Sequence, residues 1–103
     1  MRVDAKTAIL QALTEGEGFG LELQSRIETR TAGRTRLSDG SIYPALRELE
    51  RQGLVESFEG ETVRERLGRP RIYYRLTAEG HRVAQEEREE VQGLFGLGEP
   101  VFS

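Results

Sequence analysis

The sequence SDGSIYPALRELERQGL, residues 38–54, predicts a helix with two distinct faces. Apolar residues recur at helical spacing and can pack on a core, while a tyrosine and two arginines recur at i, i+4 and i+8 on another side. The apolar face holds Ile42, Leu46 and Leu49, and the second face holds Tyr43, Arg47 and Arg51. Packing and polar recognition are therefore divided between two sides of one helix.

The ends of this helix are indicated by a proline and a glycine. Pro44 has no N–H to donate and fits best in a first turn, so we expect the helix to begin between Gly40 and Tyr43. Gly53 suits the left-handed conformation of a helix stop. Leu54 can then contact Leu49, as in a Schellman motif.

Two further helices are expected before residue 38. Asp4 can cap the first, which the glycines at 16 and 18 should end. The second should begin near Gly20 and fade by Thr31, with Phe19, Leu23 and Ile27 spaced along its apolar side. A short polar link over residues 34–37 then leads into the third helix.

Two strands and a last helix are expected after residue 54. Residues 54–59 and 71–76 predict a β-hairpin, and residues 60–70 predict a long charged loop between them. On the second strand the core side should hold Ile72, Tyr74 and Leu76, and the other side Arg71, Tyr73 and Arg75. Thr77 should cap the last helix, with Glu79 in its first turn.

The charge is distributed unevenly along the 103-residue chain, whose length predicts one domain. The net charge is −3, which alone disfavours nucleic acid as a partner. Residues 34–76, however, carry nine Arg against seven acids, and residues 77–103 carry two Arg against six Glu. Between residues 64 and 75 five Arg accompany a single acid. The centre of the sequence is therefore basic enough to meet phosphates.

Other classes of function are disfavoured by the residues that the sequence lacks. It has no apolar run long enough to span a membrane and no secretory signal pattern, and the absence of cysteine favours a cytoplasmic protein. His81 is the only histidine, and no phosphate-binding glycine loop follows a strand, so we expect no enzyme activity, no metal and no cofactor. We interpret the glutamates of residues 86–90 as a solvated helix face and His81 as a surface residue.

Helix, helix, helix, two-stranded hairpin and helix is the order of a winged helix-turn-helix with an added C-terminal helix, an α+β and mainly helical fold. The motifs within this order are Ser38 to Leu46, Leu49-Glu50, Gly53-Leu54, Gly68-Arg69-Pro70-Arg71, Tyr73 to Thr77, and Gly80. With these motifs, residues 9–80 resemble the PadR family of transcriptional regulators. The resemblance implies a bacterial or archaeal type of repressor that dimerises through its C-terminal helix, and sometimes its first helix, on a partly palindromic DNA operator.

The segment after Gly80 is short, as in the compact subfamily. The tryptophans that line a drug-binding cleft in some compact members are absent from this sequence, so a small-molecule effector that relieves repression would bind through other residues.

The residues support DNA binding on chemical grounds. Arginine forks on the third helix can reach guanine edges or phosphates, and serines at its start can donate to phosphate oxygens. The extended segment from Gly68 to Arg71 resembles a minor-groove hook. Tyr73 either braces the wing or contacts the sugar-phosphate backbone. The residues predicted to bind double-stranded DNA are Arg34, Arg36, Ser38, Ser41, Tyr43, Arg47, Arg51, Arg64, Arg66, Arg69, Arg71 and Tyr73.

We expect residues 1–76 to form the DNA-binding domain and residues 77–103 a dimerisation helix and tail. Apolar residues beyond the wing have little cover in a monomer, which predicts a homodimer. Its expected contacts are Val83, Val91, Leu94, Phe95, Ile9 and Leu10. Two alternatives to a dimeric repressor are a winged-helix protein-interaction module or anti-regulator without DNA binding, and a carrier of small ligands that uses the dimer cleft.

Overall fold

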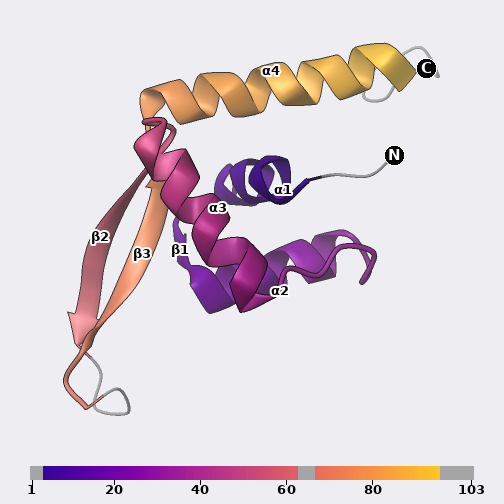
Figure 1. Cartoon of the computed structure of the whole chain (residues 1–103). Helices are drawn as coiled ribbons and strands as arrows, with labels where there is room; N and C mark the ends of the chain where they lie inside the picture. The colour runs from indigo at the N-terminus through magenta and orange to yellow at the C-terminus, as the bar shows by residue number, and fades with distance from the viewer. Residues whose placement is uncertain (1–3, 63–66, 96–103) are drawn as a thin grey trace.

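Helices surround a small core, and a hairpin projects from it, in the computed structural model, which describes residues 4–62 and 67–95 (Figure 1). Along the chain the elements are α1 (Ala5–Leu13), β1 (Gly18–Phe19), α2 (Gly20–Arg30), α3 (Asp39–Arg51), β2 (Val55–Thr62), β3 (Pro70–Leu76) and α4 (Ala78–Phe95). The order confirms the predicted α+β, mainly helical winged-helix architecture. The end of β2, the beginning of β3 and the start of α3 lie away from α4 (Figure 1).

Side-chain caps fix the helix ends that the sequence predicted. The backbone N–H of Thr7 donates to Asp4 Oδ1 at 2.8 Å, which caps α1. The N–H of Gly80 donates to Thr77 Oγ1 at 3.0 Å, which caps α4. These bonds satisfy donors that would otherwise have no partner in the first helical turn.

The stop after α3 is the predicted Schellman motif. Gly53 has φ +77°, its N–H donates to the Glu50 carbonyl at 3.0 Å, and the Leu54 N–H donates to the Leu49 carbonyl at 2.9 Å. The predicted start of α3 was wrong. The helix begins at Asp39, so Pro44 lies in the second turn and leaves the Gly40 carbonyl without its helical donor. Because Gly40 is exposed, water can satisfy that carbonyl.

The sheet has a third strand that the sequence analysis did not predict. The strand order is β1-β3-β2, with Phe19 opposite Tyr73 and Tyr73 opposite Phe58, all antiparallel. In addition, β2 continues to Thr62, through residues that were predicted to be loop. The pairing with β1 ties the entry of α2 to the base of the wing.

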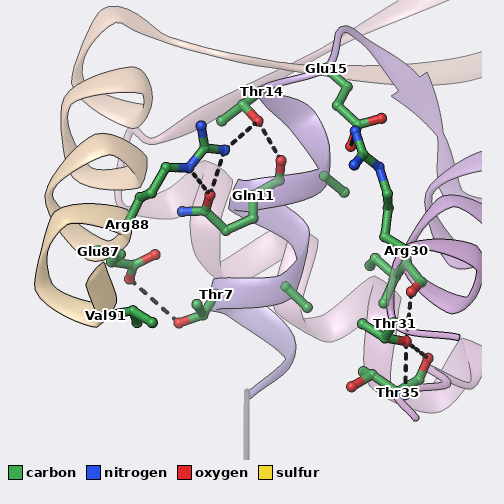
Figure 2. A pocket seen from close by; sticks show the side chains of 13 residues that line it. Thr7, Gln11, Thr14, Glu15, Arg30, Thr31, Thr35, Glu87, Arg88 and Val91 are labelled. Atoms are coloured by element: carbon green, nitrogen blue, oxygen red, sulfur yellow. Dashed lines mark hydrogen bonds and ion pairs between the residues drawn. The ribbon is translucent and has the colours of Figure 1, made fainter. Parts of the chain in front are cut away.

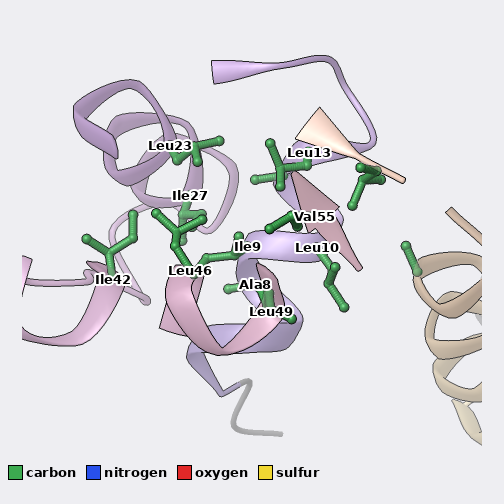
Figure 3. Packing of buried hydrophobic residues seen from close by; sticks show 13 residues of the cluster. Ala8, Ile9, Leu10, Leu13, Leu23, Ile27, Ile42, Leu46, Leu49 and Val55 are labelled. Carbon is green, nitrogen blue, oxygen red and sulfur yellow. The ribbon is translucent and has the colours of Figure 1, made fainter. Parts of the chain in front are cut away.

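The core lies between the three N-terminal helices and the base of the hairpin (Figure 3). Its fully buried large side chains are Ile9, Leu10, Leu23, Ile42, Leu46, Leu49 and Val55. The predicted apolar face of α3 is therefore confirmed. Ile72 was predicted to share this core and does not: burial falls along β3 from Leu76, 8% exposed, to Ile72, 40% exposed, because Ile72 lies beyond the reach of the helices.

Helix α4 packs against α1 and the end of β3. Gln11 Nε2 donates to the Ala84 carbonyl at 2.7 Å, and the Arg88 guanidinium donates to Gln11 Oε1 at 2.9 Å. Within residues 4–62 and 67–95, no helix is both long and apolar enough to cross a membrane.

Candidate nucleic-acid interface

The exposed side of α3 carries two arginines in different states. Arg47 is exposed, and its guanidinium makes no hydrogen bond or ion pair with any residue that the structure describes. Arg51 Nε donates to Glu48 Oε1 at 3.0 Å, and its Nη2 donates to Glu48 Oε2. This hydrogen bonding lowers the pKa of the Glu48 carboxyl and raises that of Arg51, so both groups are charged at neutral pH.

Tyr43, which was predicted to bind DNA, packs against the body of the protein. Its ring is half-buried and packs on the core cluster, and a Cβ added to Gly20 would come within 2.3 Å of its hydroxyl oxygen. Tyr43 therefore occupies the space that Gly20 leaves open at the start of α2. This contact depends on how two helices cross, which the spacing within α3 does not determine.

A second contact joins α3 to the sheet. Ser57 Oγ donates to Glu50 Oε2 at 2.6 Å, and Ser57 is opposite Tyr74 in the sheet. Burial, together with the charge of Glu50, raises the pKa of the Tyr74 phenol. Glu50 thus holds α3 against β2.

The link before α3, residues 34–37, also has two arginines in different states. Arg36 Nε lies 2.9 Å from Glu28 Oε1. The exposed guanidinium of Arg34 has no such partner among the described residues. The link is anchored by Gln24 Nε2, which donates to the Leu37 carbonyl and to Asp39 Oδ1, each at 2.9 Å.

The two serines at the start of α3 are exposed and close together. Ser38 Oγ donates to Ser41 Oγ at 3.3 Å, and the Ser38 side chain makes no capping bond to the helix. The first backbone N–H groups of α3 consequently have no side-chain cap from Ser38. Such N–H groups, with nearby hydroxyls, are suited to phosphate oxygens.

One face of the sheet carries a continuous stack of rings and guanidinium groups, which we call the sheet stack. Tyr73 stacks on Phe58 with ring centroids 5.6 Å apart and meets Phe19 edge-on at 5.4 Å. The guanidinium carbon of Arg71 lies 4.3 Å from the Phe19 centroid, and that of Arg75 lies 4.5 Å from the Phe58 centroid. Of the two alternatives for Tyr73, the structure favours bracing of the wing.

The sheet stack also changes the interpretation of Arg71. Its side chain is half-buried, and its Nε is enclosed without a hydrogen-bond partner among the described residues. Arg75 pairs with Glu56, Nε to Oε1, at 2.7 Å. Arg69 is exposed near the end of the hairpin. Arg64 and Arg66 lie outside the described residues.

The residues predicted for a dimer contact fall into three groups. Ile9 and Leu10 are 0% and 2% exposed within one protomer, so the prediction that they form a dimer surface is wrong: the core already uses them. Val83 and Val91 are partly buried on α4. The side chains of Leu94 and Phe95 lie outside the described part of the chain.

A groove runs along α1 between α2 and α4, and Val91 lies at its edge (Figure 2). Its volume is about 770 Å³, and Ala8, Ala12 and Ile27 contribute apolar surface to it. Glu87 enters it from α4: Thr7 Oγ1 donates to Glu87 Oε2 at 3.4 Å, while Glu87 Oε1 is enclosed and has no partner among the described residues. In the same described residues, no three His, Cys, Asp or Glu side chains gather closely enough to hold a metal.

The sequence analysis missed three residues that shape this surface, Glu48, Phe19 and Phe58, and only Glu48 gave a signal. Glu48 and Arg51 are three apart, the spacing of a helical ion pair. Phe19 and Phe58 are the aromatic residues that complete the sheet stack. Phe19 was assigned to the apolar side of α2, because two residues are too few to show the alternation of a strand.

Comparisons with known proteins agree on one family. The model of the transcriptional regulator PadR-like family matches residues 9–86. The transcriptional regulator YqjI of Escherichia coli (strain K12) is 34% identical over 89 residues, which are 86% of this chain and 40% of that protein. The chain therefore spans about two fifths of the length of this curated relative.

Solved structures show the same fold. A transcriptional regulator from Clostridium thermocellum has a TM-score of 0.73 and 28% identity, with 91% of each chain covered. The circadian clock associated protein Pex from Anabaena has a TM-score of 0.67 and 28% identity, over 92% of this chain and 83% of that one. Bacillus subtilis PadR in complex with operator DNA has a TM-score of 0.68 and 23% identity, over 79% of this chain and 44% of that one.

Proposed function

Because the chain belongs to the transcriptional regulator PadR-like family, which is a family of regulators and not of enzymes, we propose that it is a sequence-specific DNA-binding repressor that acts as a dimer. The observation that carries the proposal is the exposed guanidinium of Arg47 on α3, which has no partner among the described residues. An arginine fork in this state can bind a guanine edge without first breaking an ion pair.

The surroundings of Arg47 support a nucleic-acid partner. Ser38 and Ser41 offer hydroxyls at the start of the same helix, and Arg34 adds an unpaired cation from the link before it. Phosphate contacts of this kind fix the position of a protein on a duplex, and contacts to base edges select the sequence. The solved complex of B. subtilis PadR with operator DNA adds support from a protein of the same fold.

The wing supplies a second contact in this proposal. Arg69 and Arg71 lie on or near the hairpin, and Arg64 and Arg66 precede them in the sequence. We assign to these side chains phosphate or minor-groove contacts that raise affinity without selecting bases.

In this proposal a second copy of the chain completes the dimer. Residues 77–103 would form the dimer segment and residues 1–76 the DNA-binding unit. The groove between α1, α2 and α4 would receive apolar residues of the partner's α4 near Val91. Two DNA-binding units related by a two-fold axis match an operator with inverted half-sites. An effector that relieves repression would have to compete with the partner's α4 for the same groove.

Binding to the intergenic DNA beside the gene tests the proposal. Fluorescence anisotropy should show saturable binding that exceeds binding to a random-sequence duplex. Arg47→Ala should weaken operator binding by about 1–3 kcal/mol and relax the preference at one base position. Arg82→Ala is the matched control, since Arg82 is exposed on α4 and paired with Glu79. Equal operator affinity for Arg47→Ala and the wild type would remove Arg47 from the interface.

A further inference from the structure

Glu48 holds Arg51 in a geometry that DNA would also need. One edge of the guanidinium, formed by Nε and Nη2, faces the carboxylate: Nε donates to Oε1 at 3.0 Å, and Nη2 donates to Oε2. A phosphate or a guanine edge binds the same fork with two parallel hydrogen bonds. Arg51 therefore cannot bind DNA through Nε and Nη2 together while it keeps Glu48.

Only one of the two arginines on this side of α3 is paired with a carboxylate in the described part of the chain. Arg47 lies one turn earlier on the same exposed side and has no acidic partner among the described residues. The link before α3 repeats the arrangement, with Arg36 paired to Glu28 and Arg34 unpaired in the described part of the chain. Both α3 and the link before it therefore have one arginine that can bind DNA directly and one that is paired with a carboxylate.

We propose that Glu48 is an internal competitor for DNA, whose carboxylate occupies the Arg51 fork and lowers the affinity of α3 for phosphates. This inference rests on the proposed DNA-binding function and assigns to Glu48 a role in setting its strength.

The physical basis is an exchange of partners. The Glu48–Arg51 pair is solvent-exposed, 35% and 71% by side chain, and exposed pairs are weak enough for phosphates to displace. Glu48 remains ionised after the exchange, because the pKa of a surface carboxyl lies well below neutral pH. The released carboxylate then attracts a cation from solution. That uptake cancels part of the counterion release that drives protein–DNA association.

Glu48→Gln and Glu50→Gln form a matched pair of variants that tests the exchange. Both remove one negative charge from α3. Glu50, however, accepts from Ser57 Oγ at 2.6 Å instead of binding an arginine, and a glutamine carbonyl can keep that bond. Binding of each full-length variant to a fluorescein-labelled random-sequence duplex is measured by anisotropy over about 50–200 mM salt, the range in which phosphate contacts are revealed.

We expect Glu48→Gln to bind about two- to fivefold more tightly per protomer than Glu50→Gln, the range of a lost surface ion pair. Its plot of log K against log salt should also be steeper by about one unit per protomer. Equal affinity and slope for the two variants, with DNA binding intact, would overturn the role of Glu48 alone. Weaker DNA binding by Glu48→Gln than by Glu50→Gln would also overturn the proposal, and would show that Glu48 positions Arg51 for binding. A lack of DNA binding by the wild type and both variants would overturn the proposed function, and this inference with it.

Discussion

The ring of Tyr73 lies against the backbone of Gly60 on the neighbouring strand. A Cβ added to Gly60 would come within 2.2 Å of Tyr73 Cε1, which is closer than atoms in contact can approach. The glycine therefore leaves room for the ring that joins Phe19 to Phe58 in the sheet stack. A wing that projects from a small core gains side-chain packing of its own in this way.

Gly60→Ala should displace Tyr73 and lower the free energy of unfolding by about 1–2 kcal/mol, as a steric clash that a partly exposed ring can relieve. Urea unfolding followed by circular dichroism measures the loss. In a Tyr73→Ser background the same substitution should cost much less, since no ring is present to clash. A cost that is equal in both backgrounds would show that the effect comes from the strand backbone.

Gly80 and Gly40 should respond to alanine with opposite signs. At Gly80 a Cβ would lie 1.9 Å from the Leu54 carbonyl oxygen, so Gly80→Ala must move α4 away from the helix stop and should cost about 3 kcal/mol. At Gly40 the nearest atom would be Ser38 Oγ at 3.7 Å, and Gly40→Ala should stabilise the helix by about 0.5–1 kcal/mol. The same urea titration compares the two. A neutral Gly80→Ala would mean that α4 can shift without loss.

Val91→Asp should dissociate the proposed dimer without unfolding the protomer. Val91 is only partly buried on α4, and a carboxylate placed in an apolar contact between copies would be desolvated without a partner. Sedimentation at tens of micromolar protein should give a dimer for the wild type and a monomer for the variant, with unchanged helix content. A monomeric wild type would contradict the proposal directly.

The wing arginines should affect salt dependence more than sequence preference. Arg69→Ala combined with Arg71→Ala should flatten the plot of log K against log salt by about two to four units in a dimer, since each lost phosphate contact removes about one unit. Of the single variants, Arg69→Ala should have the larger effect, because Arg71 is half-buried on Phe19. An unchanged slope with altered base preference would show that the wing reads sequence.

Glu87 should make stability depend on pH in the acid range. Burial raises the pKa of its carboxyl above the ordinary value of 4.5, so the folded state holds a proton that the unfolded chain has already lost. Stability should therefore fall as the pH rises through the unfolded and then the folded pKa. Glu87→Gln should raise Tm at pH 7 and lose that advantage once the pH is below both values. An advantage that persists in acid would assign the effect to packing.

Local chemistry allowed much of the fold to be predicted. The caps at Asp4 and Thr77 and the stop at Gly53 each depend on residues a few positions apart, so the sequence contains what decides them. Contacts between elements were predicted less well. The closeness of Tyr43 to Gly20 depends on how α3 crosses α2, and the exposure of Ile72 depends on how far the hairpin extends beyond the helices.

The candidate interface was predicted in outline and corrected in detail. The exposed position of Arg47 followed from helical spacing alone. Arg51 and Arg71 were predicted to bind DNA, yet one is held by a carboxylate and the other by an aromatic ring. Spacing shows which side of an element a charge occupies. It does not show whether another side chain has already bound that charge.

The two-residue strand β1 has a mechanical consequence. Phe19 pairs with β3 in the sheet, and its backbone N–H also donates to Glu22 Oε1 at 3.1 Å in the first turn of α2. Phe19 thus joins the wing to the start of α2. A rotation of the wing would therefore move the start of this helix with it. Tyr43 of α3 packs against Gly20 at that same helix start, so on a duplex the distance between the contacts of α3 and of the wing would be set by the protein. DNA whose grooves did not match that distance would have to bend, and the electrophoretic mobility of circularly permuted operator fragments would reveal the bend.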